Sequence, residues 1–335
     1  MIVLDQENKI FTLHTQNTTY QMKVDQYHVL EHIYYGARID NRDLSGLIKC
    51  GERSFSPNPD EAGRNRDYSL DVMPQEYSTC GVGDFRLPSI ELELPGGSHT
   101  ADLRYEGFHL EKGKYKLEGL PGFHGMENEA ETLVVLLKDS AARIAVEMYY
   151  GVFEDFDLIT RAIRLVNEGT ETIRVCRCAS LCLDFTRSDL DLITFNGHHL
   201  MERCLDRGPV RPGIQSVGSV RGISSHQHNP FVMICDHDAD EDRGMCYGAM
   251  LLYSGNFEAA VECSQYENSR LVMGIHPYHF CWTLEPAGTF TAPETAMVCS
   301  PDGFGQMSRQ YHKAIRKHLL RDPYQYERKP VLVNN

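Results

Sequence analysis

Several short runs in this 335-residue chain place acidic, imidazole or hydroxyl side chains close together. Asp236–Asp240 begins like a calcium-binding loop, but Glu241 stands where that loop needs glycine and Tyr247 where it needs glutamate. Ser224–Pro230 sets hydroxyls beside imidazoles, yet adjacent residues of an extended chain point apart, so adjacency does not indicate a nucleophile and its base. We interpret the first run as a charged hairpin loop and the second as a polar loop that bonds its own backbone.

Other candidate motifs also lack a required residue. Gly81–Arg86 has no third glycine for a dinucleotide loop, and Gly213–Gly218 misses the G-x-S-x-G elbow by one position. The cluster Cys176, Cys178 and Cys182 fits a half-buried strand, on which the first two share a face, better than a zinc site. We therefore expect no metal, no cofactor and no complete catalytic set in this chain.

The stretch from Glu52 to Pro88 is the most informative candidate for binding. Its prolines and glycines indicate an ordered loop and not a repeating element. Long loops that carry many charges and aromatic rings often bind ligands, although a solvated surface loop has the same composition. The residues alone leave both interpretations open. Trp282, the single tryptophan, lies in an expected strand, which favours a core position over a sugar-stacking platform.

Composition limits the class of protein. The formal net charge of −14 argues against nucleic acid or an anionic membrane as the main partner. Hydrophobic residues make up 41% and charged residues 24%, values typical of a soluble globular protein. The 11 cysteines show no repeated C-x-x-C spacing, as expected of reduced thiols. We expect a cytoplasmic protein.

Alternating apolar and polar residues predict many short strands and almost no helix before residue 300. Asn167–Thr170 is interpreted as a hairpin turn between two of them. The pattern predicts a large all-β sandwich. The expected strands are Ile10–His14, Tyr20–Val24, Ile90–Leu94, Thr132–Leu137, Ile144–Val152, Ile159–Val166, Ile173–Leu183, Phe231–Cys235, Tyr247–Tyr253, Ala259–Tyr266, Arg270–Met273 and Phe280–Leu284.

Helical spacing of apolar residues begins only at Gly303. A stripe from Met307 to Leu319 predicts one helix, which Pro323 ends. Lys329–Asn335 then has the pattern of a buried strand. Because this strand would end the chain without a partner, we expect the sequence to be a piece of a longer protein.

An ordered series of short runs gives the chain a specific resemblance. It resembles the N-terminal part of bacterial α-galactosidases of glycoside hydrolase family 36. The matching runs are Phe55–Pro59, Ser69–Asp71, Pro74–Tyr77, Asp84–Arg86, Leu120–Pro121, Ile159–Arg161, Arg221–Gly222, Ser224–Gln227, Asn229–Phe231, Tyr253–Phe257, Pro293–Glu294, Met307–Ser308, Tyr311–His312 and Pro330–Asn335.

The resemblance implies an architecture and an activity. Residues 1–302 would form a galactose-mutarotase-like antiparallel β-supersandwich, residues 303–322 a linking helix, and residues 323–335 the start of a catalytic (β/α)8 barrel. The two aspartates of a retaining hydrolase, whose carboxyl groups stand about 5–5.5 Å apart, would lie in the missing barrel. The chain by itself is then expected to be inactive.

The resemblance also implies substrate contacts. The resemblance implies a tetramer in which the N-terminal loops of one subunit reach the galactose pocket of a neighbouring subunit. Glu52 takes the place of an aspartate that contacts galactose there, and Arg66 is a donor to that carboxylate or to the sugar. His199 stands where the family carries a substrate-contacting tryptophan. Two further departures are His276 in place of asparagine and Ala287 in a proline–glycine turn.

Two other hypotheses remain open at this point. The chain could be a free-standing carbohydrate-binding or assembly domain without catalysis, or part of an enzyme for other glycosides. The first hypothesis predicts a stop codon directly after Asn335 in the coding sequence. The second predicts that the full-length enzyme hydrolyses none of a panel of α-galactosides.

Overall fold

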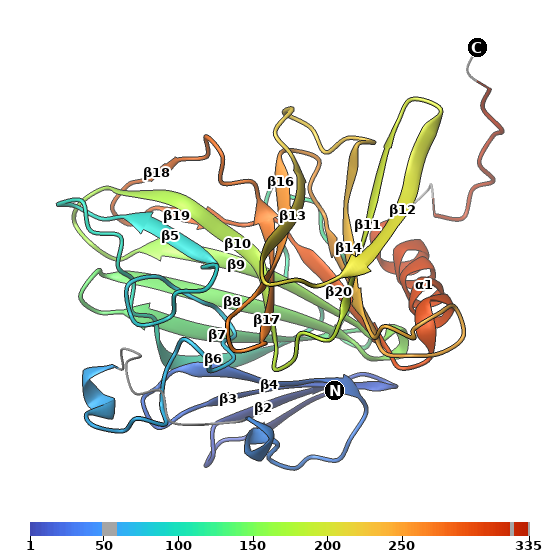
Figure 1. Cartoon of the computed structure of the whole chain (residues 1–335). Coiled ribbons are helices and arrows are strands. Elements are labelled where there is room, and N and C mark those ends of the chain that lie inside the picture. Colours follow the sequence, from blue (N-terminus) through green and yellow to red (C-terminus); the bar gives the residue numbers. More distant parts are fainter. Residues whose placement is uncertain (49–58, 322–324, 334–335) are drawn as a thin grey trace.

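The computed structural model describes residues 1–48, 59–321 and 325–333. Their architecture consists of three antiparallel sheets and one long helical segment (Figure 1). The expected all-β class is confirmed. Glu52 lies outside the described residues.

The first sheet is a four-stranded meander at the N-terminus. Consecutive strands pair in the order β1-β2-β3-β4, and Figure 1 shows this sheet along the lower side of the molecule. Both faces of β2 and β3 are largely covered, because their residues are nearly all buried. The strands are β1 Ile2–Asp5, β2 Ile10–His14, β3 Thr18–Val24 and β4 Leu30–Ala37.

The second sheet has six strands that come from distant parts of the sequence. Its order is β13-β16-β17-β10-β18, and β5 also pairs with the long strand β10. The strands are β5 Ile90–Glu93, β10 Ile173–Phe185, β13 Gly213–Ser219, β16 Phe257–Cys263, β17 Ser269–Ile275 and β18 Trp282–Leu284.

The third sheet has ten strands in the order β12-β11-β14-β15-β20-β9-β8-β7-β6, with β19 also paired to β9. On β8 the alternate residues from Ile144 to Val152 are at most 2% exposed, as the strand period of two predicts. The strands are β6 Arg104–Lys112, β7 Glu131–Asp139, β8 Ile144–Phe153, β9 Leu158–Asn167, β11 Asp191–His198, β12 Met201–Pro209, β14 His228–Cys235, β15 Cys246–Leu251, β19 Thr289–Thr291 and β20 Thr295–Ser300.

One apolar core joins the three sheets. It includes Tyr20 of β3, Tyr150 of β8 and Leu181 of β10, all fully buried. At roughly 25 cal/mol per Å2 of buried apolar surface, a core of this size is the main stabilising contribution to the fold. Loops that lie over it can therefore be held by a rigid support.

The helical segment is shorter than predicted. α1 spans Gly303–Ala314 and a π-helical turn, η4, spans Ile315–Leu319. The expected stripe is confirmed, since Met307, Tyr311 and Ala314 are buried. The chain leaves the helix at Leu320, where the backbone becomes extended, and not at Pro323. Short 3-10 helices are η1 Ser45–Leu47, η2 Asp60–Ala62 and η3 Glu154–Phe156.

Three sequence-based expectations are wrong. Asn167–Thr170 is not a hairpin turn, because β9 and β10 belong to different sheets and this turn carries the chain between them. Trp282 is 49% exposed, because its strand β18 is a short sheet edge. Residues 329–333 form no strand, and Val331 is 92% exposed, since no described strand lies beside them to pair their backbone groups.

The Asp236–Asp240 hairpin loop is confirmed, because it joins the paired strands β14 and β15.

Candidate functional site

The described candidate residues lie on two separate parts of the molecule. Arg66 is exposed in the loop that follows η2, and His199 is exposed in the turn between β11 and β12. The neighbours of Arg66 in the chain, Asn65 and Asp67, line a hollow against β3 and β4 of the lower sheet. The β11–β12 hairpin extends from the opposite, upper side (Figure 1). A single chain therefore does not bring Arg66 and His199 into one site.

The hollow beside Arg66 has a volume of about 540 Å3 and a charged wall. Lys23, Asp25 and Glu31 line it together with Tyr68. The Tyr68 hydroxyl donates a hydrogen bond to Asp25 Oδ2, which fixes one side of the hollow. Glu31 is 4% exposed and its Oε1 atom has no hydrogen-bond partner. Burial, reinforced by the negative charge of Asp25, raises the pKa of Glu31 to about 8.

Substitution of Glu31 tests this assignment. Its folded pKa is raised above the ordinary 4.5, so the folded protein loses stability as pH rises from about 4.5 to about 8. Glu31→Gln, a neutral isostere, is expected to raise the free energy of unfolding by about 1–2 kcal/mol at pH 8 and to leave it unchanged at pH 4. Urea unfolding across this pH range measures the difference. An equal effect at both pH values would exclude a raised pKa.

A network of buried ion pairs holds the loop from Pro59 to Pro88 in place. Arg270 of β17 donates from Nε and Nη2 to the two carboxylate oxygens of Asp184, at 2.7 and 2.8 Å, and from Nη1 to Asp84 Oδ2 at 2.8 Å. Arg86 donates to both oxygens of Asp84, at 2.9 and 3.0 Å. All four side chains are at most 4% exposed. The network is thus shielded from water and from salt.

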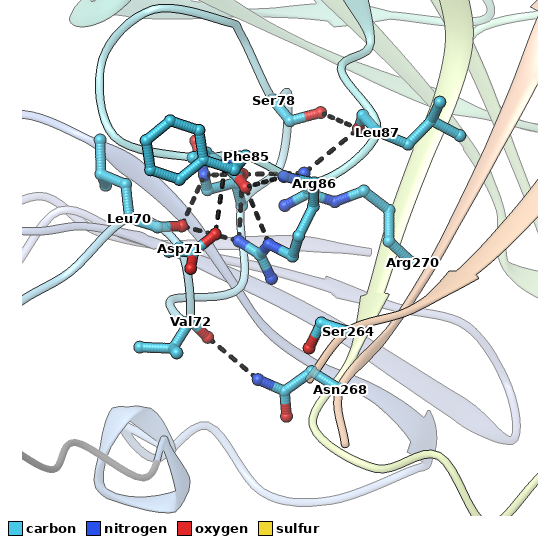
Figure 2. A network of polar contacts seen from close by, with 12 residues as sticks. Leu70, Asp71, Val72, Ser78, Phe85, Arg86, Leu87, Ser264, Asn268 and Arg270 are labelled. Carbon is cyan, nitrogen blue, oxygen red and sulfur yellow. Dashed lines mark hydrogen bonds and ion pairs between the residues drawn. The ribbon is translucent and has the colours of Figure 1, made fainter. Parts of the chain in front are cut away.

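The same arginine closes the loop on itself. Arg86 Nη2 also donates to the carbonyl oxygens of Leu70 and Met73, at 2.8 and 2.7 Å. Figure 2 shows its guanidinium turned inward toward Leu70 and Asp71. Asp71 accepts a hydrogen bond from the backbone of Phe85 at 3.2 Å. The buried arginine therefore holds both arms of the loop, while the Phe85 ring remains 72% exposed.

A second buried centre forms around Glu76. Its carboxylate accepts hydrogen bonds from the hydroxyls of Tyr20 and Tyr150, and His32 Nδ1 lies 3.2 Å from it. Arg161 of β9 donates to the Glu76 carbonyl and, at 2.9 Å, to the carbonyl of Cys182. Burial alone would raise the pKa of Glu76, but Arg161 and His32 outweigh it and lower the pKa. Glu76 therefore remains ionised in the core and ties the loop to three sheets.

The chemistry available to these centres is structural. In the two ion centres, the carboxylates of Asp84, Asp184 and Glu76 are committed to arginine, tyrosine or backbone partners, so none of these three is free to act as a nucleophile or a proton donor. Within residues 1–48, 59–321 and 325–333, no group of three or more histidine, cysteine or acidic side chains is arranged to hold a metal ion. Among the same residues, no helix is both long and apolar enough to cross a bilayer.

Sequence reasoning missed the residues that form these centres. Asp84–Arg86 and Ile159–Arg161 were noted only as matching runs, and Asp184 and Arg270 were not noted for any role. A usable signal was present, since Arg161 and Arg270 each lie directly beside apolar residues in strands that are mostly apolar. A buried arginine requires a buried carboxylate, but the sequence does not identify which one.

The family comparisons agree over nearly the whole chain. Residues 28–285 match the model of the glycosyl hydrolase family 36 N-terminal domain, and residues 289–335 match the melibiase model. The chain is 41% identical over 334 residues to the bifunctional alpha-galactosidase/sucrose kinase AgaSK of Mediterraneibacter gnavus, covering 100% of this chain and 36% of that protein. It is 38% identical over 337 residues to alpha-galactosidase AgaA of Geobacillus stearothermophilus, covering 100% of this chain and 46% of that protein.

Solved structures give the same result. The galactosidase domain of AgaSK superposes with a TM-score of 0.96 at 41% identity, covering 99% of this chain and 46% of that chain. A variant of AgaA in complex with raffinose superposes with a TM-score of 0.94 at 38% identity, covering 98% of this chain and 45% of that chain. The chain thus spans less than half the length of these relatives.

Proposed function

The chain belongs to glycosyl hydrolase family 36 as its N-terminal domain, and from this premise we propose that it is the N-terminal part of an α-galactosidase. The observation that carries the proposal is the end-to-end match at 41% identity to a relative named for that activity. The full-length enzyme would hydrolyse terminal non-reducing α-D-galactose with retention of configuration. The two catalytic aspartates would lie in a barrel that follows this chain.

The substrate class follows from relatives. AgaA variants have been solved in complex with raffinose and in complex with stachyose, at 38% and 39% identity to this chain. We propose galactosides of this kind, including melibiose and raffinose, as substrates. The ten described cysteines are all free, which supports a reducing, cytoplasmic location.

Within such an enzyme, this domain would support assembly and complete the substrate pocket. Glu52, Arg66 and His199 are the proposed substrate contacts. Because Arg66 and His199 lie on opposite sides of one chain, a pocket that both contact would take them from two subunits, which supports an oligomeric enzyme such as the proposed tetramer. The two buried ion centres support the same role, since they hold the Arg66 loop in one shape before substrate arrives.

A direct test uses the full-length protein and this chain side by side. The full-length enzyme is expected to release galactose from aryl α-galactosides, melibiose and raffinose, with no turnover by residues 1–335 alone. Proton NMR during hydrolysis should show the α-anomer of galactose first. A stop codon directly after Asn335 in the gene, or a full-length enzyme inactive on every α-galactoside, would overturn the proposal.

Glu52 provides a residue-level test. In the full-length enzyme, Glu52→Ala is expected to raise KM for raffinose roughly three- to tenfold, the cost of one lost hydrogen bond to the sugar. The unfolding temperature should remain unchanged. Initial-rate kinetics and thermal unfolding measure the two quantities. Glu61→Ala, an exposed carboxylate in the same loop, is the matched control. An unchanged KM for Glu52→Ala would remove this residue from the site.

A further inference from the structure

The strand register brings two cysteines to neighbouring positions at one edge of the six-stranded sheet. β10 pairs with β18 through Ile173 with Leu284, Arg174 with Thr283 and Val175 with Trp282. Continued by one residue, this antiparallel register would place Cys176 of β10 opposite Cys281, which directly precedes β18, and Cys281 is among the groups that act electrostatically on Cys176. Opposed residues of antiparallel strands have Cα atoms about 4.5–5.5 Å apart, within the range of about 4.4–6.8 Å that a disulfide spans.

A β-bulge at Cys176 places this residue and Cys178 on different faces of β10. The sequence interpretation placed Cys176 and Cys178 on one face of a regular strand, which is wrong. The register between β5 and β10 shifts between Val175 and Arg177, so Cys176 is an extra residue on β10. Cys178 is therefore 1% exposed in the core, whereas Cys176 lies half-buried on the outer face with Arg174.

Arg174 connects the Cys281 thiol to the carboxylate of Glu93. Its Nε donates to Cys281 Sγ at 3.0 Å, and its Nη1 donates to Glu93 Oε2 at 2.8 Å. Burial raises the pKa of Cys176, and the neighbouring charge of Cys281 raises it further. The Cys281 sulfur is thus close enough to act electrostatically on Cys176. Cys281 is exposed and carries the guanidinium contact, so it is the sulfur that reacts first.

We propose that Cys176 and Cys281 form a reactive dithiol site that takes small hydroperoxides as oxidants and closes to a disulfide. In the first step the Cys281 thiolate attacks one peroxide oxygen. The S–O bond forms, the O–O bond breaks, and the departing hydroxide takes up a proton to become water.

In the second step the Cys176 sulfur attacks the sulfur of the Cys281 sulfenic acid. The S–S bond forms, the S–O bond breaks, and the leaving hydroxide accepts the Cys176 proton. Overall, two thiols and one hydrogen peroxide give one disulfide and two waters. The sulfurs are oxidised and the peroxide is reduced.

The disulfide would fix the short edge strand β18 to β10. β18 contributes only three residues to the sheet, and the side chain of its Trp282 is 49% exposed. A covalent link from Cys281 to β10 holds this edge strand in register. The oxidised protein would therefore protect the backbone amides of β18 against hydrogen exchange, and a thiol reductant would reverse the effect.

The test treats the purified chain with stoichiometric hydrogen peroxide, blocks free thiols, and maps peptides without reduction. We expect a Cys176–Cys281 cross-link as the dominant product, lost in Cys281→Ser and in Cys176→Ser, and retained in Cys204→Ser. Arg174→Gln should slow its formation roughly two- to fivefold, as expected for loss of one exposed ionic contact. Cys204 is half-buried on β12 and serves as the matched thiol control.

A second measurement does not depend on the oxidant. Phenylarsine oxide bridges two neighbouring thiols and should remain bound to the reduced chain after a monothiol wash. Either serine variant of the pair should release it. Oxidation that leaves Cys176 and Cys281 unlinked, or links them no faster than it modifies Cys204, would overturn the proposal, as would arsenical retention that survives both substitutions.

Discussion

Replacing Arg270 with alanine is expected to lower the free energy of unfolding by about 3–5 kcal/mol, because buried Asp184 would lose both of its hydrogen bonds from Arg270 and buried Asp84 would lose one, leaving Arg86 as the single cation beside two carboxylates. Both lie within 2.8 Å of the Arg270 guanidinium, and the arginine itself is 1% exposed. Urea unfolding of the chain at pH 7 measures the loss. Arg243→Ala is the matched control, since Arg243 is 74% exposed in its pair with Asp240 and should cost less than about 1 kcal/mol.

The pH dependence of the lost unfolding free energy shows whether the lost ion pair is its cause. Burial by itself would raise the pKa of Asp184, but Arg270 outweighs this effect and lowers the pKa below its ordinary 3.8. In the native protein this pair therefore stabilises the fold above about pH 4, and the stabilisation is lost as pH falls further. Without Arg270 the carboxylate takes up a proton more readily. The deficit of Arg270→Ala should be largest at pH 7 and shrink toward pH 4, and a constant deficit would instead indicate lost packing.

Replacing Arg66 with alanine in the full-length enzyme is expected to reduce kcat/KM for raffinose roughly 10- to 100-fold, the cost of removing a hydrogen bond to a charged group at the substrate. Arg66 is exposed, and the buried contacts of Arg86 and Arg270 that hold its loop remain in place when it is replaced. The free energy of unfolding should therefore remain within about 0.5 kcal/mol of the native value.

Arg64 provides the control for that experiment. It is exposed two residues away in the same loop, so Arg64→Ala makes an equal change in charge. Steady-state kinetics on raffinose should leave Arg64→Ala within about twofold of the native enzyme. If both variants lose activity equally, long-range charge explains the effect and Arg66 has no specific contact. If neither does, the assignment of Arg66 to the pocket fails.

Strand periodicity predicted most of the fold. The helical spacing of α1 and the alternation on β8 were readable because apolar residues that face the core repeat at the period of each element. The pairing of strands could not be predicted from periodicity. Asn167–Thr170 has the composition of a hairpin turn, yet β9 finds its neighbours in β8 and β20, and only tertiary packing makes that choice.

The candidate site was predicted unevenly. The loop from Glu52 to Pro88 was identified by its composition, and the resemblance supplied Arg66 and His199. The residues that give the loop its shape could not be paired in advance, because Asp84 and Arg270 are separated by 186 positions. Trp282 and Cys176 show the same limit, since a sheet edge and a β-bulge decide their exposure, and neither has a strong sequence signal.

The ion network around Arg86 has a consequence for biosynthesis. Its partners are contributed at positions 84, 184 and 270, so the last of them leaves the ribosome long after the loop itself has been made. Contacts between residues so far apart in sequence form late in folding. The nascent loop would therefore stay accessible to chaperones and proteases until β17 emerges. Synthesis rate between residues 84 and 270 then becomes a determinant of the yield of folded protein.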